Sequence, residues 1–159
     1  MNTRYLTTVV EEHVRGALSR EYGVQFIKSA LPLSTGGHHE FDAVAADGSI
    51  IASVKSASGL TAGGKIPSGK IKDCIAELYF LSLVEAPRRV LILTSPKFYD
   101  LFTRTMRGKV ASGIEVIHLS LPADVQAEVT AVQERASAEV FPVLDRSEQA
   151  SSARVGDLT

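Results

Sequence analysis

Hydrophobic residues recur along the chain at two periods, and these periods predict its helices and strands. The helical spacing of Val10, Val14 and Leu18 predicts a first helix over residues 7–22, which Gly23 would end. Further helices are predicted over residues 69–83, 96 to about 106, and 123–140. Apolar or alternating segments predict strands over residues 24–33, 40–46, 49–56, 90–94 and 114–119. In the second helix we expect one face made of Ile71, Ile75, Leu78 and Ser82, flanked by Cys74 and Leu81.

The order of these elements, αβββαβ and then αβα, predicts the fold class. Asp47-Gly48 is a strong turn signal between the second and third strands, so the first three strands should form a meander. The later helix-strand crossovers imply a mixed α/β sheet with helices on both faces. We expect a single domain over residues 1–144 and a polar, flexible tail over residues 145–159.

Composition and charge narrow the classes of function. Apolar residues make up 45% of the chain and charged residues 22%, as in ordinary globular proteins, and no apolar run is long enough to span a membrane. The N-terminus lacks the apolar stretch of a signal peptide, and Cys74 is the only cysteine, so we expect a cytoplasmic protein without disulfides. A net charge of −1 argues against a protein that coats DNA. It still permits a local basic groove beside an acidic metal site.

The hairpin from Asp42 to Lys55 is the main candidate for chemistry. Ser53 and Lys55 share one face of their strand, and Asp42 would meet Lys55 if the hairpin register allows. Such a pair suits phosphodiester hydrolysis, in which a carboxylate holds Mg²⁺, the metal bridges a phosphate oxygen and a water, and the lysine orients or deprotonates that water. The same two residues are also typical of a solvated cross-strand ion pair.

The segment FDAVAADGSIIASVK resembles the core motif of the PD-(D/E)xK phosphodiesterase superfamily, which includes many restriction enzymes, archaeal Holliday-junction resolvases and several repair nucleases. The order of elements over residues 7–94 also matches the core of that family. Asp42 takes the place of the family's first acid, and Lys55 ends its tripeptide. The resemblance implies a restriction-endonuclease-like fold and a Mg²⁺- or Mn²⁺-dependent endonuclease acting on DNA, with the carbonyl of Val54 toward the metal.

The tripeptide departs from the family pattern, because Ser53 stands where the second acid is expected. In one branch of the family's restriction enzymes, an SxK tripeptide is paired with a Glu on the following helix. The resemblance therefore points to Glu77 as the displaced metal ligand, with Asp73, one turn earlier, as a second candidate. It also points to Glu11, in phase with the apolar stripe of the first helix, as an assisting acid. Alternatively, the metal site is broken and the domain is an inactive nuclease-fold module that binds nucleic acid or a protein.

Residues 64–71, GKIPSGKI, form a second candidate site, since they nearly match the phosphate-binding P-loop pattern GxxxxGK[ST]. However, Ile71 replaces the hydroxyl that holds Mg²⁺, and Pro67 has no N–H to offer a phosphate. Nucleotide binding is therefore a third hypothesis. We expect the lysines of this region to contact a nucleic-acid backbone instead, namely Lys65, Lys70 and Lys72.

Two further expectations concern histidines and assembly. His38 and His39 lack a Cys or a well-spaced third His, which disfavours zinc, and we expect them at the mouth of the site in contact with substrate or solvent. Since one small domain rarely cuts both strands of DNA, a homodimer is expected.

Overall fold

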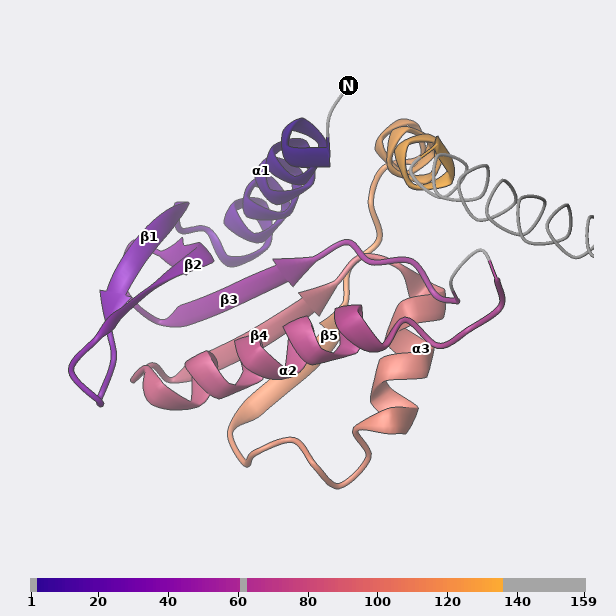
Figure 1. Cartoon of the computed structure of the whole chain (residues 1–159). Coiled ribbons are helices and arrows are strands. Elements are labelled where there is room, and N and C mark those ends of the chain that lie inside the picture. Colours follow the sequence, from indigo (N-terminus) through magenta and orange to yellow (C-terminus); the bar gives the residue numbers. More distant parts are fainter. Residues whose placement is uncertain (1–2, 61–62, 136–159) are drawn as a thin grey trace, which may run out of the picture.

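The computed structural model describes residues 3–60 and 63–135, and it confirms the predicted order of elements (Figure 1). The elements are α1 (Thr3–Tyr22), β1 (Phe26–Pro32), β2 (His38–Ala45), β3 (Ile50–Lys55), α2 (Ser68–Leu83), β4 (Arg88–Leu93), α3 (Pro96–Thr105) and β5 (Ile114–His118). A last helix occupies residues 123–135. The predicted end of that helix at residue 140 and the predicted tail over residues 145–159 lie outside the described residues.

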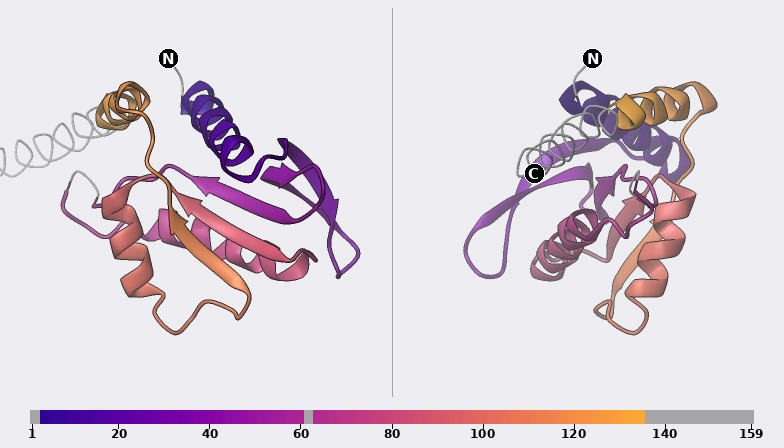
Figure 2. Two further views of the ribbon diagram at one scale, coloured as in Figure 1. Left: turned by 180° about the vertical axis from the view of Figure 1, so that it is seen from behind. Right: turned by 45° about the vertical axis from the view of Figure 1, so that its right-hand side comes forward.

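The five strands form one open sheet in the order β1-β2-β3-β4-β5. The pairs β1–β2 and β2–β3 are antiparallel, whereas β3–β4 and β4–β5 are parallel. The chain therefore forms a mixed sheet, as predicted. Helix α1 and the last helix cover one face of the sheet, and α2 and α3 cover the other (Figure 2).

Each face of the sheet has its own hydrophobic core. On the face of α1 and the last helix, the largest fully buried side chains are Val10, Val14, Ile92 and Val129. On the face of α2 and α3, they are Phe41, Leu81, Leu91, Leu93, Phe98 and Phe102. Burial on both faces explains why β4 is a continuous apolar run rather than an alternating one.

The buried face of α2 differs from the predicted one. Its buried residues are Ile71, Cys74, Leu78 and Leu81. Ile75 is 41% exposed and Ser82 is exposed, so the face expected to carry them is not the face that packs on the sheet. These residues are spaced by three, four and three positions. The buried face therefore includes Cys74 and Leu81, which the prediction placed beside the expected face. Glu77 lies three residues after Cys74, so it borders the buried stripe.

Element ends also differ from the prediction by a few residues. Helix α1 begins at Thr3 rather than residue 7, and Leu6 in its first turns is buried in the core. Strand β4 begins at Arg88, where the guanidinium bonds both carboxylate oxygens of Glu115 on β5. The end residues are mostly polar, so a hydrophobic pattern does not reveal them. Their tertiary contacts nevertheless extend the helix and the strand.

The predicted turn at Asp47-Gly48 is confirmed. Gly48 has a φ of 73°, a left-handed conformation that favours glycine. The Asp47 carboxylate accepts a hydrogen bond from the backbone N–H of Ser49 at 3.0 Å. These features set the pairing between β2 and β3.

Among the helices of the described residues, none combines the length and the apolar character needed to cross a membrane.

Truncation of two α2 residues tests this orientation of the helix. Leu81→Ala should lower the free energy of unfolding by about 2–5 kcal/mol, because it empties a fully buried position. Ile75→Ala, on the exposed side of the same helix, should change it by less than about 1 kcal/mol. Urea denaturation of both variants measures the difference. Equal losses would contradict this orientation of α2.

Candidate carboxylate site

A β-bulge in β2 places the first acid of the site. The pairing of β1 with β2 runs through Ile27↔Val44 and then Ser29↔Phe41, so β2 has one extra residue. Asp42 and Ala43 together are opposite Lys28 as a result. Such bulges redirect side chains, and here Phe41 and Ala43 pack on opposite faces of the sheet instead of sharing one.

The Asp42 side chain joins β2 to β3 just beyond the end of their backbone pairing. The ladder of β2 and β3 comprises Ala43↔Ala52 and Val44↔Ile51. One residue farther along, the Oδ2 atom of Asp42 accepts a hydrogen bond from the N–H of Val54 at 2.7 Å. On the other side, the Arg15 guanidinium of α1 donates to the Asp42 carbonyl at 2.8 Å. The backbone and side chain of Asp42 are therefore both fixed.

The electrostatic environment of Asp42 is unusual for a carboxylate. Burial raises the pKa of Asp42 from 3.8 to about 6, even though the hydrogen bond from Val54 favours the ionised form. The negative charges of Glu11 and Glu77 raise this pKa further, and the positive charge of Lys28 lowers it. Asp42 thus lies within the fields of one acid from α1 and one from α2.

Glu77 meets the serine of the tripeptide. Its Oε2 atom accepts a hydrogen bond from the hydroxyl of Ser53 at 2.8 Å, and its Oε1 atom lies 4.0 Å from the Lys55 ammonium. Ser53 is fully buried. A carboxylate from α2 therefore lies within hydrogen-bond distance of Ser53, the residue that stands where the resemblance implies an acid. Asp73, the second candidate, is exposed.

His39 supports Glu77, a role that the sequence prediction missed. Its Nε2 atom is 3.2 Å from Glu77 Oε2. The imidazole stacks on Phe80 at a centroid distance of 4.0 Å and meets the edge of Phe41 at 4.9 Å. His39 and Phe41 are two residues apart on β2, so their side chains point to the same face of the sheet. This alternation could have indicated that His39 lies beside the core. His38 is exposed.

Glu11 is buried beside the core stripe of α1, as its helical phase predicted. Its Oε2 atom lies 3.1 Å from the Lys28 ammonium and 3.6 Å from the Arg15 guanidinium. The hydrogen bond to Glu11 raises the pKa of Lys28, which burial opposes. The sequence prediction missed both cations. Only strand pairing shows that Lys28 is opposite Asp42, whereas the spacing of four residues between Glu11 and Arg15 on α1 was an available signal. We call Glu11, Asp42 and Glu77, with Lys28 and Lys55, the carboxylate site.

Two N–H groups at the start of α2 are already bonded within the chain. The N–H of Ser68 donates to the carbonyl of Ile66 at 2.8 Å, and the N–H of Ile71 donates to the carbonyl of Pro67 at 3.1 Å. Pro67 itself has no N–H. These groups are unavailable to a nucleotide. The predicted nucleic-acid contacts are all exposed at or near the start of α2, namely Lys65, Lys70 and Lys72.

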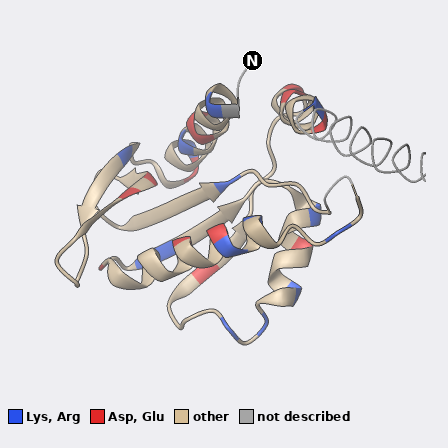
Figure 3. Cartoon of the chain, in the orientation of Figure 1, with Lys and Arg blue, Asp and Glu red and all other residues tan. Residues whose placement is uncertain are grey.

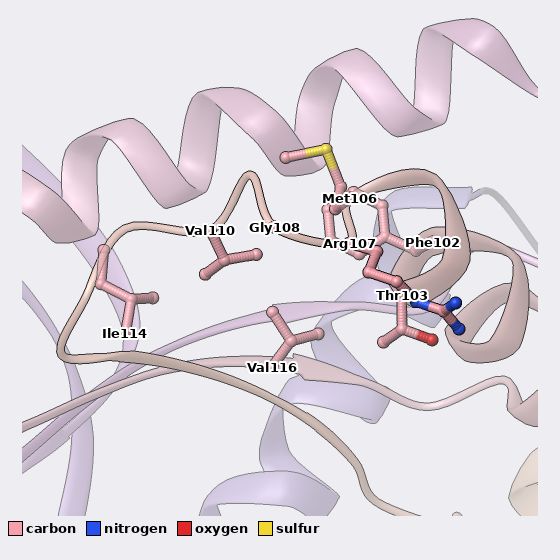
Figure 4. Close-up of a pocket in the computed structure, with 8 residues that line it drawn as sticks. All are labelled: Phe102, Thr103, Met106, Arg107, Gly108, Val110, Ile114 and Val116. Carbon is pink, nitrogen blue, oxygen red and sulfur yellow. The ribbon is translucent and has the colours of Figure 1, made fainter.

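Three further features of the described residues bear on this site. A cavity of about 270 Å³ between the end of α3 and β5 is mostly apolar and has no acid in its lining (Figure 4). Both signs of charge occur along α1 and α2, so neither helix presents a uniformly basic surface (Figure 3). Within residues 3–60 and 63–135, no group of three or more His, Cys, Asp or Glu side chains is arranged to hold a metal ion.

Comparison with known proteins does not add to this picture. No family model, curated protein or solved structure matches the chain.

Because the pKa of Asp42 is raised, a substitution that removes its charge should increase the stability of the protein by an amount that depends on pH. Because the pKa is higher in the folded protein, the stabilisation from the Asp42 proton is complete below pH 3.8 and is lost as pH rises through about 6. Asp42→Asn should therefore become more stable than the wild type between about pH 4 and pH 7.5. The gain should reach at most about 3 kcal/mol, since one pKa unit corresponds to about 1.4 kcal/mol.

Urea denaturation across this pH range measures the gain, with Asp47→Asn as the control. The hydrogen bond from the Ser49 hydroxyl lowers the pKa of the exposed Asp47, so its contribution changes only at more acidic pH. Asp47→Asn should show no increasing gain over the same range. A flat difference for Asp42→Asn as well would contradict the electrostatic environment described here.

Proposed function

We propose that the chain is a Mg²⁺- or Mn²⁺-dependent phosphodiesterase of the PD-(D/E)xK type that acts as an endonuclease on DNA in the cytoplasm. The observation that carries this proposal is the contact of Glu77 with Ser53, close to Lys55. It supplies a carboxylate at the position where the SxK tripeptide lacks one. The resemblance of the hairpin sequence to that superfamily supports DNA as the substrate.

The donor set of the site fits a hard divalent cation. Mg²⁺ is usually held by one or two carboxylates, with waters and substrate phosphates completing six oxygen ligands. Asp42 and Glu77 would be the protein carboxylates, and the carbonyl of Val54 is a further proposed ligand. The raised pKa of Asp42 supports this fit, because a cation would offset the repulsion from Glu11 and Glu77. When bound, the metal would supply Lewis-acid polarisation of the phosphate.

The residues of the chain have separate roles in this proposal. Lys55 is half-buried at the end of β3, where its ammonium can donate a hydrogen bond to the attacking water and orient it. Ser53 and His39 hold the Glu77 carboxylate in place. Glu11 assists by accepting from Lys28 and by adding negative charge beside Asp42.

Substrate binding would extend beyond the carboxylate site. Lys65, Lys70 and Lys72 would contact phosphates of the DNA backbone, since lysines bind phosphate without reading sequence. A homodimer would bring two such sites to the two strands of a duplex.

The alternative function is an inactive nuclease-fold module that binds nucleic acid or a protein. Two observations favour it. Glu77 already bonds Ser53 and His39, and no three potential ligand side chains converge on a metal position within the described part of the chain. The two proposals differ in whether purified protein cuts DNA.

A nicking assay separates them. With Mg²⁺ or Mn²⁺, the wild type should cut plasmid or branched DNA. Lys55→Ala, Asp42→Asn and Glu77→Gln should each lower the rate by about 100-fold or more, since losing one electrostatic partner of a transition state has effects of this size. Gel electrophoresis of the products measures the rates. Lys109→Ala removes an exposed lysine outside the site and should cut at the wild-type rate.

Absence of cutting by the wild type on every substrate would contradict the enzyme proposal and favour the binding module. Cutting that persists in Lys55→Ala would show that a different site performs the chemistry.

A further inference from the structure

Lys28 differs from an ordinary surface lysine because its ammonium lies close to two carboxylates. Its ammonium is 3.1 Å from Glu11 Oε2 and 3.6 Å from Glu40 Oε1. The bulge in β2 also places its backbone opposite Asp42. One lysine therefore lies among acids from α1 and β2 at the edge of the carboxylate site.

Lys28 is also the main partner of a buried acid. The side chain of Glu11 is only 8% exposed, and a buried carboxylate requires a hydrogen-bonded counter-charge. The other cation near it, Arg15, bonds the carbonyl of Asp42 at 2.8 Å and is 3.6 Å from Glu11. Arg15 therefore bonds a backbone carbonyl, whereas the ammonium of Lys28 contacts carboxylates.

Lys28 is free to move in a way that Arg15 is not. Its side chain is 41% exposed, and its flexible four-carbon stem starts from β1, which is at the edge of the sheet. The ammonium can rotate into solvent without displacing a core residue. A divalent cation arriving at Asp42 would repel it, because both positive charges seek the same acidic field.

We propose that Lys28 is an internal counter-ion, which neutralises the carboxylate site in the metal-free protein and must yield when a divalent cation binds. This inference rests on the proposed function, because it assumes that the carboxylate site is a metal site. Lys28 is a positioning residue in this scheme and does not touch the substrate.

Binding of Mn²⁺ to the intact chain without DNA tests the proposal. Isothermal titration calorimetry at low salt should give Lys28→Met a Kd for Mn²⁺ on the order of tenfold lower than that of the wild type, because a competing charge is gone. Lys28→Arg, which keeps the charge, should bind Mn²⁺ as the wild type does. Lys109→Met controls for the change in net charge and should also match the wild type.

The outcomes separate this inference from the proposed function. If the wild type binds Mn²⁺, Asp42→Asn does not, and Lys28→Met binds equally or more weakly, the counter-ion role is overturned while the metal site stands. Binding only in Lys28→Met would support the role strongly. Absence of binding in both proteins would overturn the metal site and the counter-ion together. If Lys28→Met does not fold, Lys28→Gln gives the same comparison, since it removes the charge but keeps a donor for Glu11.

Discussion

The hydrogen bond from the backbone of Val54 to the carboxylate of Asp42 is the constraint on which the rest of the site depends. Strand β3 is covered on both faces, so each of its N–H groups needs a partner inside the protein. At Val54 that partner is an acid rather than a backbone carbonyl. The strand pairing thereby holds a negative charge next to the core, and the bulge in β2 makes this geometry possible.

This arrangement lowers the stability of the fold at neutral pH. A carboxylate whose pKa is raised to about 6 by burial and by two acidic neighbours is ionised at neutral pH at a cost to folding. The positive charge of Lys28 reduces this cost. Local destabilisation of this kind is common where a protein binds a ligand, since the ligand supplies the missing compensation.

The sequence predicted the fold well because its signals were local. Helical periods, the apolar run of β4 and the Asp47-Gly48 turn each determine one element. Glu77 was named through the family resemblance, and the structure brings it into a hydrogen bond with Ser53, while its role as a metal ligand stays a prediction. Lys28 and His39 were missed because their roles depend on strand register and on contacts between β2 and α2. The buried face of α2 was missed because Ile75 is apolar yet exposed.

The border position of Glu77 on α2 couples the packing of the helix to the geometry of the carboxylate site. The same helix surface carries the packing residues Cys74 and Leu81. A core substitution that rotated α2 slightly would move the Glu77 carboxylate away from Ser53 before it unfolded the domain. Substitutions in this part of the interior therefore affect the Glu77–Ser53 contact as well as stability, and a variant can lose that contact while its fold persists.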